Sequence, residues 1–155
     1  MKFLSMIVLT FILTTSLWAK SVLIDVQLSP SGSFQIKTNK IKGKIKKSGD
    51  ILSAKKITVR SKHLKSGIDL RDDHIRKRIG KKVVITDAKG KNAKGTAKIT
   101  FNGVTKKIPF TYKEKGKEVA ISFKLNLKKF KVKDLTYMGV GAKDIIKVRA
   151  SVPLK

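Results

Sequence analysis

The chain has 155 residues, in which 37 Lys plus Arg stand against 10 Asp plus Glu, a formal net charge of +27, and it contains no cysteine. At this length a single domain around one core is expected. The absence of cysteine excludes disulfide-stapled scaffolds, thiolate metal centres and cysteine nucleophiles. Because 41% of the residues are hydrophobic, the chain can still bury a core, and its charge does not predict disorder.

The first 19 residues are typical of a signal peptide. Lys2 precedes an apolar stretch from Phe3 to Leu13, and a small residue, Ala19, stands where a peptidase would cut. We expect residues 1–19 to be removed on export, which leaves a domain of residues 20–155 with a net charge of +26 in the periplasm or outside the cell. The alternative is an uncleaved membrane anchor, but the apolar run is short for a span of about 20 residues.

Residues 20–155 show apolar side chains at every second position, as in strands with one buried face. The polar partner between them is usually lysine. Nine alternating stretches, near residues 22–28, 34–38, 41–46, 57–59, 83–85, 97–101, 108–112, 119–127 and 146–154, predict a barrel of roughly eight strands. Turn signals such as Asn102-Gly103 separate them, and the short connections favour antiparallel neighbours.

One segment breaks the alternation. In Asp69–Ile79, Leu70, Ile75 and Ile79 fall near helical spacing, and acidic residues precede basic ones. We expect one short helix that ends at Gly80. Many short antiparallel strands and a single helix predict an all-β fold, a closed or nearly closed barrel without exposed strand edges.

The positive charge has three interpretations. Nucleic acid is not expected as a partner, because 32 of the 37 basic residues are lysine and they alternate along nearly every strand. A solvated outer face explains this pattern more simply. Attraction to anionic lipid headgroups or envelope polymers stays open.

The sequence offers little catalytic chemistry, so an enzyme, a metal site and a cofactor are not expected. Asp72-Asp73-His74 is the only cluster of acid/base groups, and three consecutive helical residues splay around the axis. We interpret it as structural, with Asp72 and Asp73 serving the helix N-terminus and pairing with nearby arginines. His63 lies on a predicted strand and is not expected to be a ligand, and Gly139-Val140-Gly141 is interpreted as a loop.

Three segments in order carry a resemblance to a known family. They are Arg71-Asp72-Asp73-His74-Ile75, then Gly95 and Ile99 with Gly103-Val104-Thr105, then Lys129-Phe130 and Val140 to Asp144. Together they resemble the YceI family of exported lipid-binding proteins, over most of residues 20–155. Two family features are absent: the opening His-Ser pair, and an aromatic stretch after the helix that residues 80–85 replace.

The resemblance implies a lipocalin-like, up-and-down antiparallel barrel of about eight strands. It also implies a long apolar ligand in the barrel, such as a polyisoprenoid, an isoprenoid quinone or a fatty-acid derivative. The inward-facing candidates for the lining are Phe34, Ile36, Ile99, Phe101, Phe110, Tyr112, Ile121 and Phe123, with the Tyr112 hydroxyl available to a headgroup. The alternative is that the same side chains fill a solid core.

Two functions from different classes follow. The first is a periplasmic carrier that encloses a long-chain amphiphile and makes transient contact with anionic membrane surfaces. The second is a cationic envelope-binding protein in which the barrel is only a scaffold. A homodimer remains an open possibility for either function.

Overall fold

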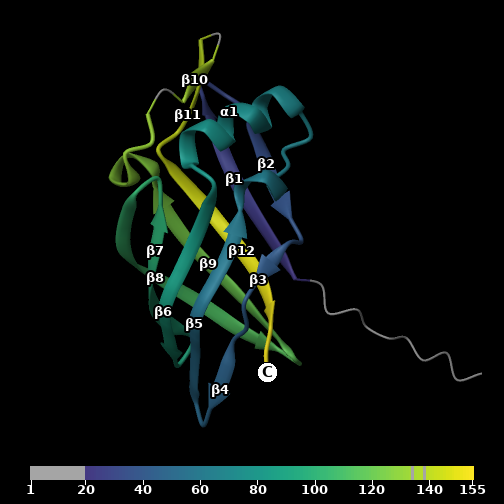
Figure 1. The fold of residues 1–155 in the computed structure, drawn as a ribbon, viewed down its shortest axis with the longest axis vertical. Helices are drawn as coiled ribbons and strands as arrows, with labels where there is room; N and C mark the ends of the chain where they lie inside the picture. Colours follow the sequence, from purple (N-terminus) through teal and green to yellow (C-terminus); the bar gives the residue numbers. More distant parts are fainter. Residues whose placement is uncertain (1–19, 134, 138) are drawn as a thin grey trace, which may run out of the picture.

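An antiparallel sheet makes up most of the molecule (Figure 1). The computed structural model describes residues 20–133, 135–137 and 139–155. Within them the sheet has twelve strands: β1 (Ser21–Ser29), β2 (Ser33–Thr38), β3 (Ile41–Lys42), β4 (Lys46–Ser48), β5 (Ile51–Arg60), β6 (Lys82–Lys91), β7 (Lys94–Phe101), β8 (Val104–Lys115), β9 (Glu118–Asn126), β10 (Thr136–Tyr137), β11 (Val140–Ala142) and β12 (Ile145–Pro153).

The strands follow an up-and-down order. From β5 to β9 each strand pairs with the next along the chain, then β9 pairs with β12 and β12 with β1. The β7–β8 turn has positive φ at both Asn102 and Gly103, the geometry that suits the twist of a two-residue hairpin. The first and last long strands are therefore neighbours in the wall.

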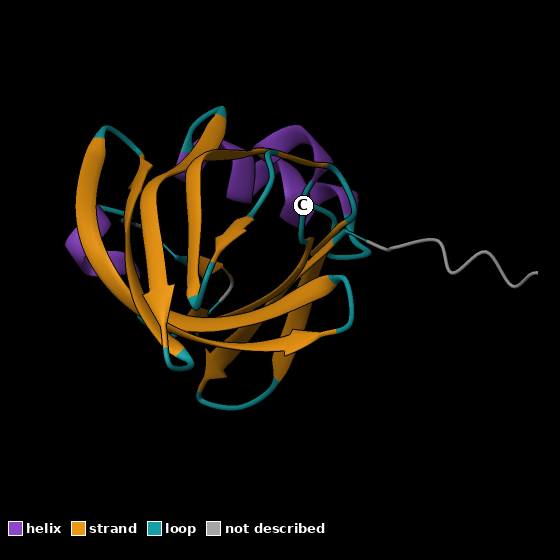
Figure 2. Cartoon of the chain, turned by 90° about the horizontal axis from the view of Figure 1, so that it is seen from below, coloured by secondary structure: helices purple, strands orange, loops and turns teal. Residues whose placement is uncertain are grey.

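One bent run of chain closes the barrel. β2 pairs with β1, whereas β3 and β4, which follow it directly, pair with β5. Gly43 lies between β3 and β4 with φ of 126°, and a Cβ there would lie 2.6 Å from the Lys56 carbonyl oxygen, so this close approach requires glycine. The two ends of the sheet are thereby joined, and the view from below shows the strands as a ring (Figure 2).

The expected fold class is confirmed, but the strand count is higher than eight. Gly43 divides the expected strand at residues 41–46 into β3 and β4. The interpretation of Gly139-Val140-Gly141 as a loop is wrong, because Val140 and Gly141 belong to β11, which forms a short hairpin with β10. Both differences concern strands of two or three residues, which are too short to show an alternating pattern.

The expected helix is present as α1 (Asp69–Ile79) and ends at Gly80, where φ is 82°. Two 3-10 helices accompany it, η1 (Ser61–His63) and η2 (Leu127–Phe130). The prediction of a strand at His63 is wrong, because the chain turns into η1 directly after β5. Both the backbone N–H and the hydroxyl of Ser61 donate to the Lys81 carbonyl there.

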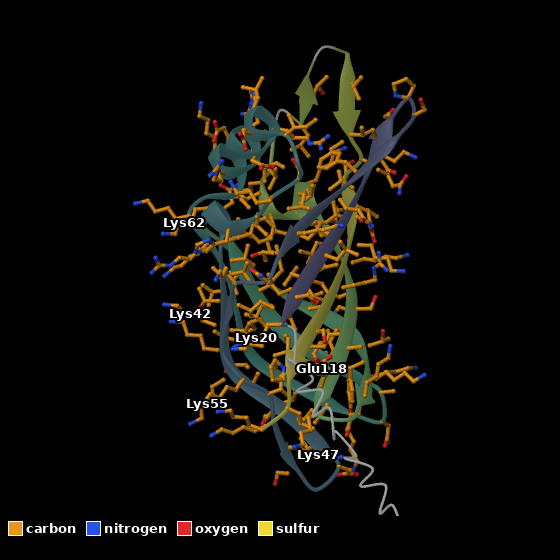
Figure 3. All side chains as sticks on the ribbon, turned by 90° about the vertical axis from the view of Figure 1, so that its right-hand side faces the viewer. Lys20, Lys42, Lys47, Lys55, Lys62 and Glu118 are labelled. Atoms are coloured by element: carbon orange, nitrogen blue, oxygen red, sulfur yellow. The ribbon has the colours of Figure 1, made fainter. Side chains whose placement is uncertain are left out.

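The two ends of the barrel differ. α1 and the β10–β11 hairpin lie at one end, which we call the α1 end, and the β4–β5 hairpin lies at the other, the β4 end (Figures 1 and 3). Each described lysine after Lys20 is exposed, and Lys42, Lys55 and Lys62 project from one side of the wall (Figure 3). The lysines therefore form the solvated outer face that their alternation predicts.

The expected signal peptide, residues 1–19, lies outside the described residues. In the part of the chain that the structure describes, no helix combines the length and the apolar character needed to cross a membrane.

Candidate functional site

A cavity of about 200 Å³ lies inside the barrel. Its lining is almost wholly apolar, because alternate side chains on each long strand point inward. An apolar cavity of about 150 Å³ in another protein stays dry and accepts a benzene molecule. The barrel therefore encloses an open apolar space somewhat larger than that cavity.

All eight residues predicted to line the barrel border this cavity. They lie on four strands: Phe34 and Ile36 on β2, Ile99 and Phe101 on β7, Phe110 and Tyr112 on β8, and Ile121 and Phe123 on β9. Ile99 is only 2% exposed and Phe101 only 5%. Their place on the inner face is observed, while their contact with a ligand remains a prediction.

Two aromatic rings on the inner face of β8 lie close to glycines of the neighbouring strands. A Cβ at Gly90 would lie 2.6 Å from Cε1 of Tyr112, and one at Gly95 would lie 2.4 Å from Cζ of Phe110. The two ring centroids are 6.1 Å apart. Because Gly90 of β6 and Gly95 of β7 have no side chain, the two rings can lie close to the backbone of the wall and leave more of the cavity open.

At the β4 end, an ion pair joins strands that are not neighbours in the sheet. Lys47 Nζ of β4 donates to Glu114 Oε2 of β8 at 2.8 Å, whereas β5, β6 and β7 separate these strands in the wall. This hydrogen bond and the Glu114 charge raise the pKa of Lys47, and Tyr112 adds a smaller attraction. The Tyr112 hydroxyl, predicted to reach a headgroup, therefore belongs to this end.

At the α1 end, the helix itself borders the cavity. Ile75, Arg78 and Ile79 line it, and their i, i+3, i+4 spacing places them on one helix face. Arg78 is the one charged side chain among the lining residues of the described chain. The sequence analysis did not predict that α1 lines the cavity, although the i, i+4 spacing of Ile75 and Ile79 in the sequence indicates one apolar helix face.

The Arg71-Asp72-Asp73-His74 motif anchors the start of α1. Asp72 is 2% exposed, and its Oδ1 accepts hydrogen bonds from the backbone N–H and the hydroxyl of Ser66, at 2.8 and 2.5 Å. Arg71 donates to the Ser66 hydroxyl and carbonyl oxygens, both at 2.9 Å, and its guanidinium lies 3.9 Å from the ring centroid of Phe34. The motif therefore ties the loop before the helix to a cavity-lining residue.

The other two members of the motif face solvent. Asp73 is exposed and pairs with Arg76 at 2.7 Å, one of the arginine pairs that the sequence suggested, and His74 is also exposed. Neighbouring positions 72, 73 and 74 thus point in different directions. Among the described residues, no group of three or more His, Asp or Glu side chains could hold a metal ion.

The Gly103-Val104-Thr105 segment forms the turn into β8 at the α1 end of the wall. Val104 packs against the core, and the hydroxyls of Thr105 and Thr100 are hydrogen-bonded across the hairpin at 2.7 Å. Asn102 donates to the carbonyl oxygens of Phe130 and Lys131, at 3.0 and 3.1 Å. The turn therefore holds η2 against the barrel, where Phe130 stacks on Phe101 with centroids 4.2 Å apart.

No family model matches the sequence, and no curated protein does. Solved structures match its fold. A polyisoprenoid-binding domain from Saccharophagus degradans, implicated in plant cell wall breakdown, superposes with a TM-score of 0.63 over 86% of this chain and 92% of that domain, at 9% identity. BcnA from Burkholderia cenocepacia gives a TM-score of 0.61 over 84% of this chain and 94% of its own, at 13% identity.

The chain has the YceI-like fold. The resemblance seen in the sequence is therefore confirmed at the level of the fold. In this YceI-like barrel, the residues that replace the family's aromatic stretch after the helix lead into β6. Val83 and Ile85 of that strand line the cavity.

Proposed function

We propose that the protein is a carrier, exported from the cytoplasm, that encloses a long-chain apolar amphiphile in its barrel. The observation that carries the proposal is the nearly closed barrel around a cavity of about 200 Å³ with an almost wholly apolar lining. Such a lining offers few groups for chemistry on a polar substrate. It suits a polyisoprenoid, an isoprenoid quinone or a fatty-acid derivative.

The affinity can come from burial alone. Transfer of about ten methylenes from water into the barrel gives about 8 kcal/mol at about 0.8 kcal/mol each, before the loss of motional freedom is subtracted. Useful binding therefore requires no buried charge. The polyisoprenoid-binding domain that shares this fold is described as a binder of the same class of molecule, which supports the choice of ligand.

The export part of the proposal rests on residues 1–19, whose basic start and apolar stretch are those of a signal peptide. Outside the cytoplasm, a water-insoluble chain released from one membrane needs a carrier to reach another site.

The second candidate is a cationic envelope-binding protein with the barrel as a scaffold. The exposure of the described lysines after Lys20 favours it, because side chains that face solvent can approach an anionic surface. Salt distinguishes the two functions. The Debye length falls from about 10 Å at 0.1 M to about 3 Å at 1 M, so surface binding is lost while an enclosed ligand stays bound.

Native mass spectrometry of residues 20–155, purified from the natural host in high salt without detergent, tests the proposal. We expect one long-chain lipid per barrel, which organic extraction then identifies. An apo mass together with no uptake of added isoprenoids or fatty acids would contradict the carrier function.

Replacing either of two alanines by phenylalanine tests whether the ligand lies inside the barrel. Ala150 lines the cavity, whereas Ala120 lies on the outer face of the adjacent strand, where it is paired with Ser151. We expect Ala150→Phe to lower the amount of bound lipid and Ala120→Phe to leave it unchanged. Equal lipid content in both variants would place the ligand outside the barrel.

A further inference from the structure

Exposed apolar side chains gather at one end of the barrel. Ile68 and Leu70, at the start of α1, are 53% and 57% exposed, and Val140 of the β10–β11 hairpin is 40% exposed. Both elements lie at the α1 end in two perpendicular views (Figures 1 and 3). The other large apolar side chains that are exposed in the described chain are Ile145, which begins β12 just after the hairpin, and Ile51, at the β4 end.

Exposed lysines lie near these side chains in the sequence, together with the exposed Asp69 between Ile68 and Leu70. Lys62 and Lys65 precede α1, Lys77 lies within it, and Lys143 follows the β10–β11 hairpin, and all four are exposed. Figure 3 shows Lys62 projecting from the side of the barrel below α1. Exposed apolar side chains with lysines nearby bind the interface of anionic bilayers, because the apolar side chains enter the headgroup region while the lysines meet lipid phosphates.

We propose that the α1 end docks on anionic lipid bilayers through Ile68, Leu70 and Val140, and that the ligand passes between bilayer and cavity at this end. Only the passage of ligand rests on the carrier function proposed above. The docking itself rests on exposure and charge.

The same helix faces both the docking surface and the cavity. Successive residues of an α-helix are rotated by about 100°, so Leu70 lies about 180° from Ile79 around the axis. Ile79 and Ile75 line the cavity, whereas Leu70 is exposed. α1 would thus touch a docked bilayer on one face and the bound chain on the other.

Charge decides between the occupants of this surface. A second copy would bring another domain of net charge +26 against the same lysines, and the two copies would repel each other. A nucleic acid would meet the lysines but would give Ile68, Leu70 and Val140 nothing to bury against. A bilayer with anionic lipid satisfies both kinds of side chain.

Cosedimentation with vesicles tests docking. The probe vesicles contain phosphatidylglycerol and phosphatidylcholine in equal parts, with pure phosphatidylcholine as the uncharged comparison. We expect the protein to bind the vesicles that contain phosphatidylglycerol and not to bind those of pure phosphatidylcholine. We also expect the double variant Ile68→Ser, Leu70→Ser to bind at least about tenfold more weakly, since two apolar side chains leave the interface.

The structure supplies controls for folding and for charge. Ile68 is the N-cap of α1 and makes no side-chain cap bond, so Ile68→Ser introduces a preferred capping residue and does not weaken the helix. Ile51→Ser removes a 43% exposed side chain at the opposite end and is expected to bind like the wild type. Lys65→Glu with Lys77→Glu is expected to abolish binding, whereas Lys55→Glu with Lys113→Glu, an equal change of charge on the wall, is expected to weaken it only modestly.

Two readouts separate docking from carriage. Equilibrium uptake of a fluorescent fatty acid in vesicle-free buffer reports the cavity, and the rate of its transfer to vesicles reports the docked state. We expect the Ile68, Leu70 variant to keep its uptake and lose most of its transfer rate. Wild-type vesicle binding in that variant, or an equal loss in Ile51→Ser, would overturn docking at this end. A third outcome is that the double variant loses vesicle binding while the wild type takes up no fluorescent fatty acid. That outcome would support docking and overturn the carrier function.

Discussion

The ring of Tyr112 lies over Gly90, so closely that a Cβ on residue 90 would come within 2.6 Å of ring carbon Cε1. These residues are on β8 and β6, with β7 between them in the sheet. Because glycine lacks a side chain, the ring can lie against the wall two strands away. The open space in the barrel thus depends on glycines in the wall as much as on the aromatic residues.

Gly90→Ala is expected to destabilise the protein by about 1–3 kcal/mol, the usual cost of overpacking a well-packed interior. The φ of Gly90 is not in the left-handed region, so the cost comes from the ring and not from the backbone. Urea denaturation measures it. In a Tyr112→Leu background the same substitution should cost much less, and an equal cost in both backgrounds would contradict the assignment.

Asp72→Ala is expected to lower the free energy of unfolding by about 1–3 kcal/mol. The substitution leaves the Ser66 N–H without the buried carboxylate that accepts it, and the desolvation penalty of that donor is then uncompensated. Helix loss at low denaturant, followed by circular dichroism, is the measurement.

The neighbouring aspartate is the control. Asp73 has a side chain that is 60% exposed and pairs with Arg76 at i+3, an interaction worth roughly 0–1 kcal/mol at a surface. Asp73→Ala should therefore change stability far less than Asp72→Ala. Equal effects would mean that helix propensity and not the Ser66 contact sets the cost.

Short sequence patterns predicted much of the fold. The α1 bounds follow from the spacing of Ile75 and Ile79, from the order of acidic and basic residues and from Gly80, all within one stretch of sequence, whereas Leu70 lies on the opposite, exposed face. The inward direction of residues such as Ile99 and Phe123 follows from a period of two, which a strand imposes regardless of its partners. Each of these inferences needed information from only a few neighbouring residues.

Features that depend on distant residues were not predictable. Gly43 lets the run from β3 to β4 lie close against β5, but its requirement comes from the Lys56 carbonyl on that strand. The alternation could not show that α1 covers an end of the cavity, since a helix can pack anywhere on a barrel. The partner of Asp72 was likewise missed, because Ser66 lies in a loop whose path no periodicity defines.

Asp25 is expected to contribute stability that disappears in acid. Its pKa lies below the ordinary value of 3.8, mainly because Gln35 donates a hydrogen bond at 2.8 Å; burial opposes this, and the hydrogen bond and charge of Arg149 add to it. A depressed pKa in the folded state means that the contribution is complete above the unfolded value and is lost as the pH falls through the folded one.

Gln35→Leu should raise the pKa of Asp25 toward 3.8 and shift the acid-unfolding midpoint to higher pH. Carboxyl NMR titration of Asp25 measures the first effect and circular dichroism against pH the second. Gln27→Leu, an exposed glutamine on β1, is the matched control and should change neither. An unaltered Asp25 titration in Gln35→Leu would show that Arg149 alone holds the carboxylate.

Phe123→Trp should shorten the ligand that the barrel accepts. Phe123 lines the cavity from β9, so a larger ring takes volume that a bound chain would occupy. Each methylene excluded costs about 0.8 kcal/mol, about a fourfold loss of affinity. The penalty should therefore grow with chain length in a competition series of fatty acids, from little effect on short chains to a large effect on long ones. Lys124→Trp adds the same ring on the exposed face of β9 and should leave the series unchanged. A loss in Phe123→Trp that is uniform across all lengths would place the long end of the chain away from Phe123 and would require a different path for the ligand through the barrel.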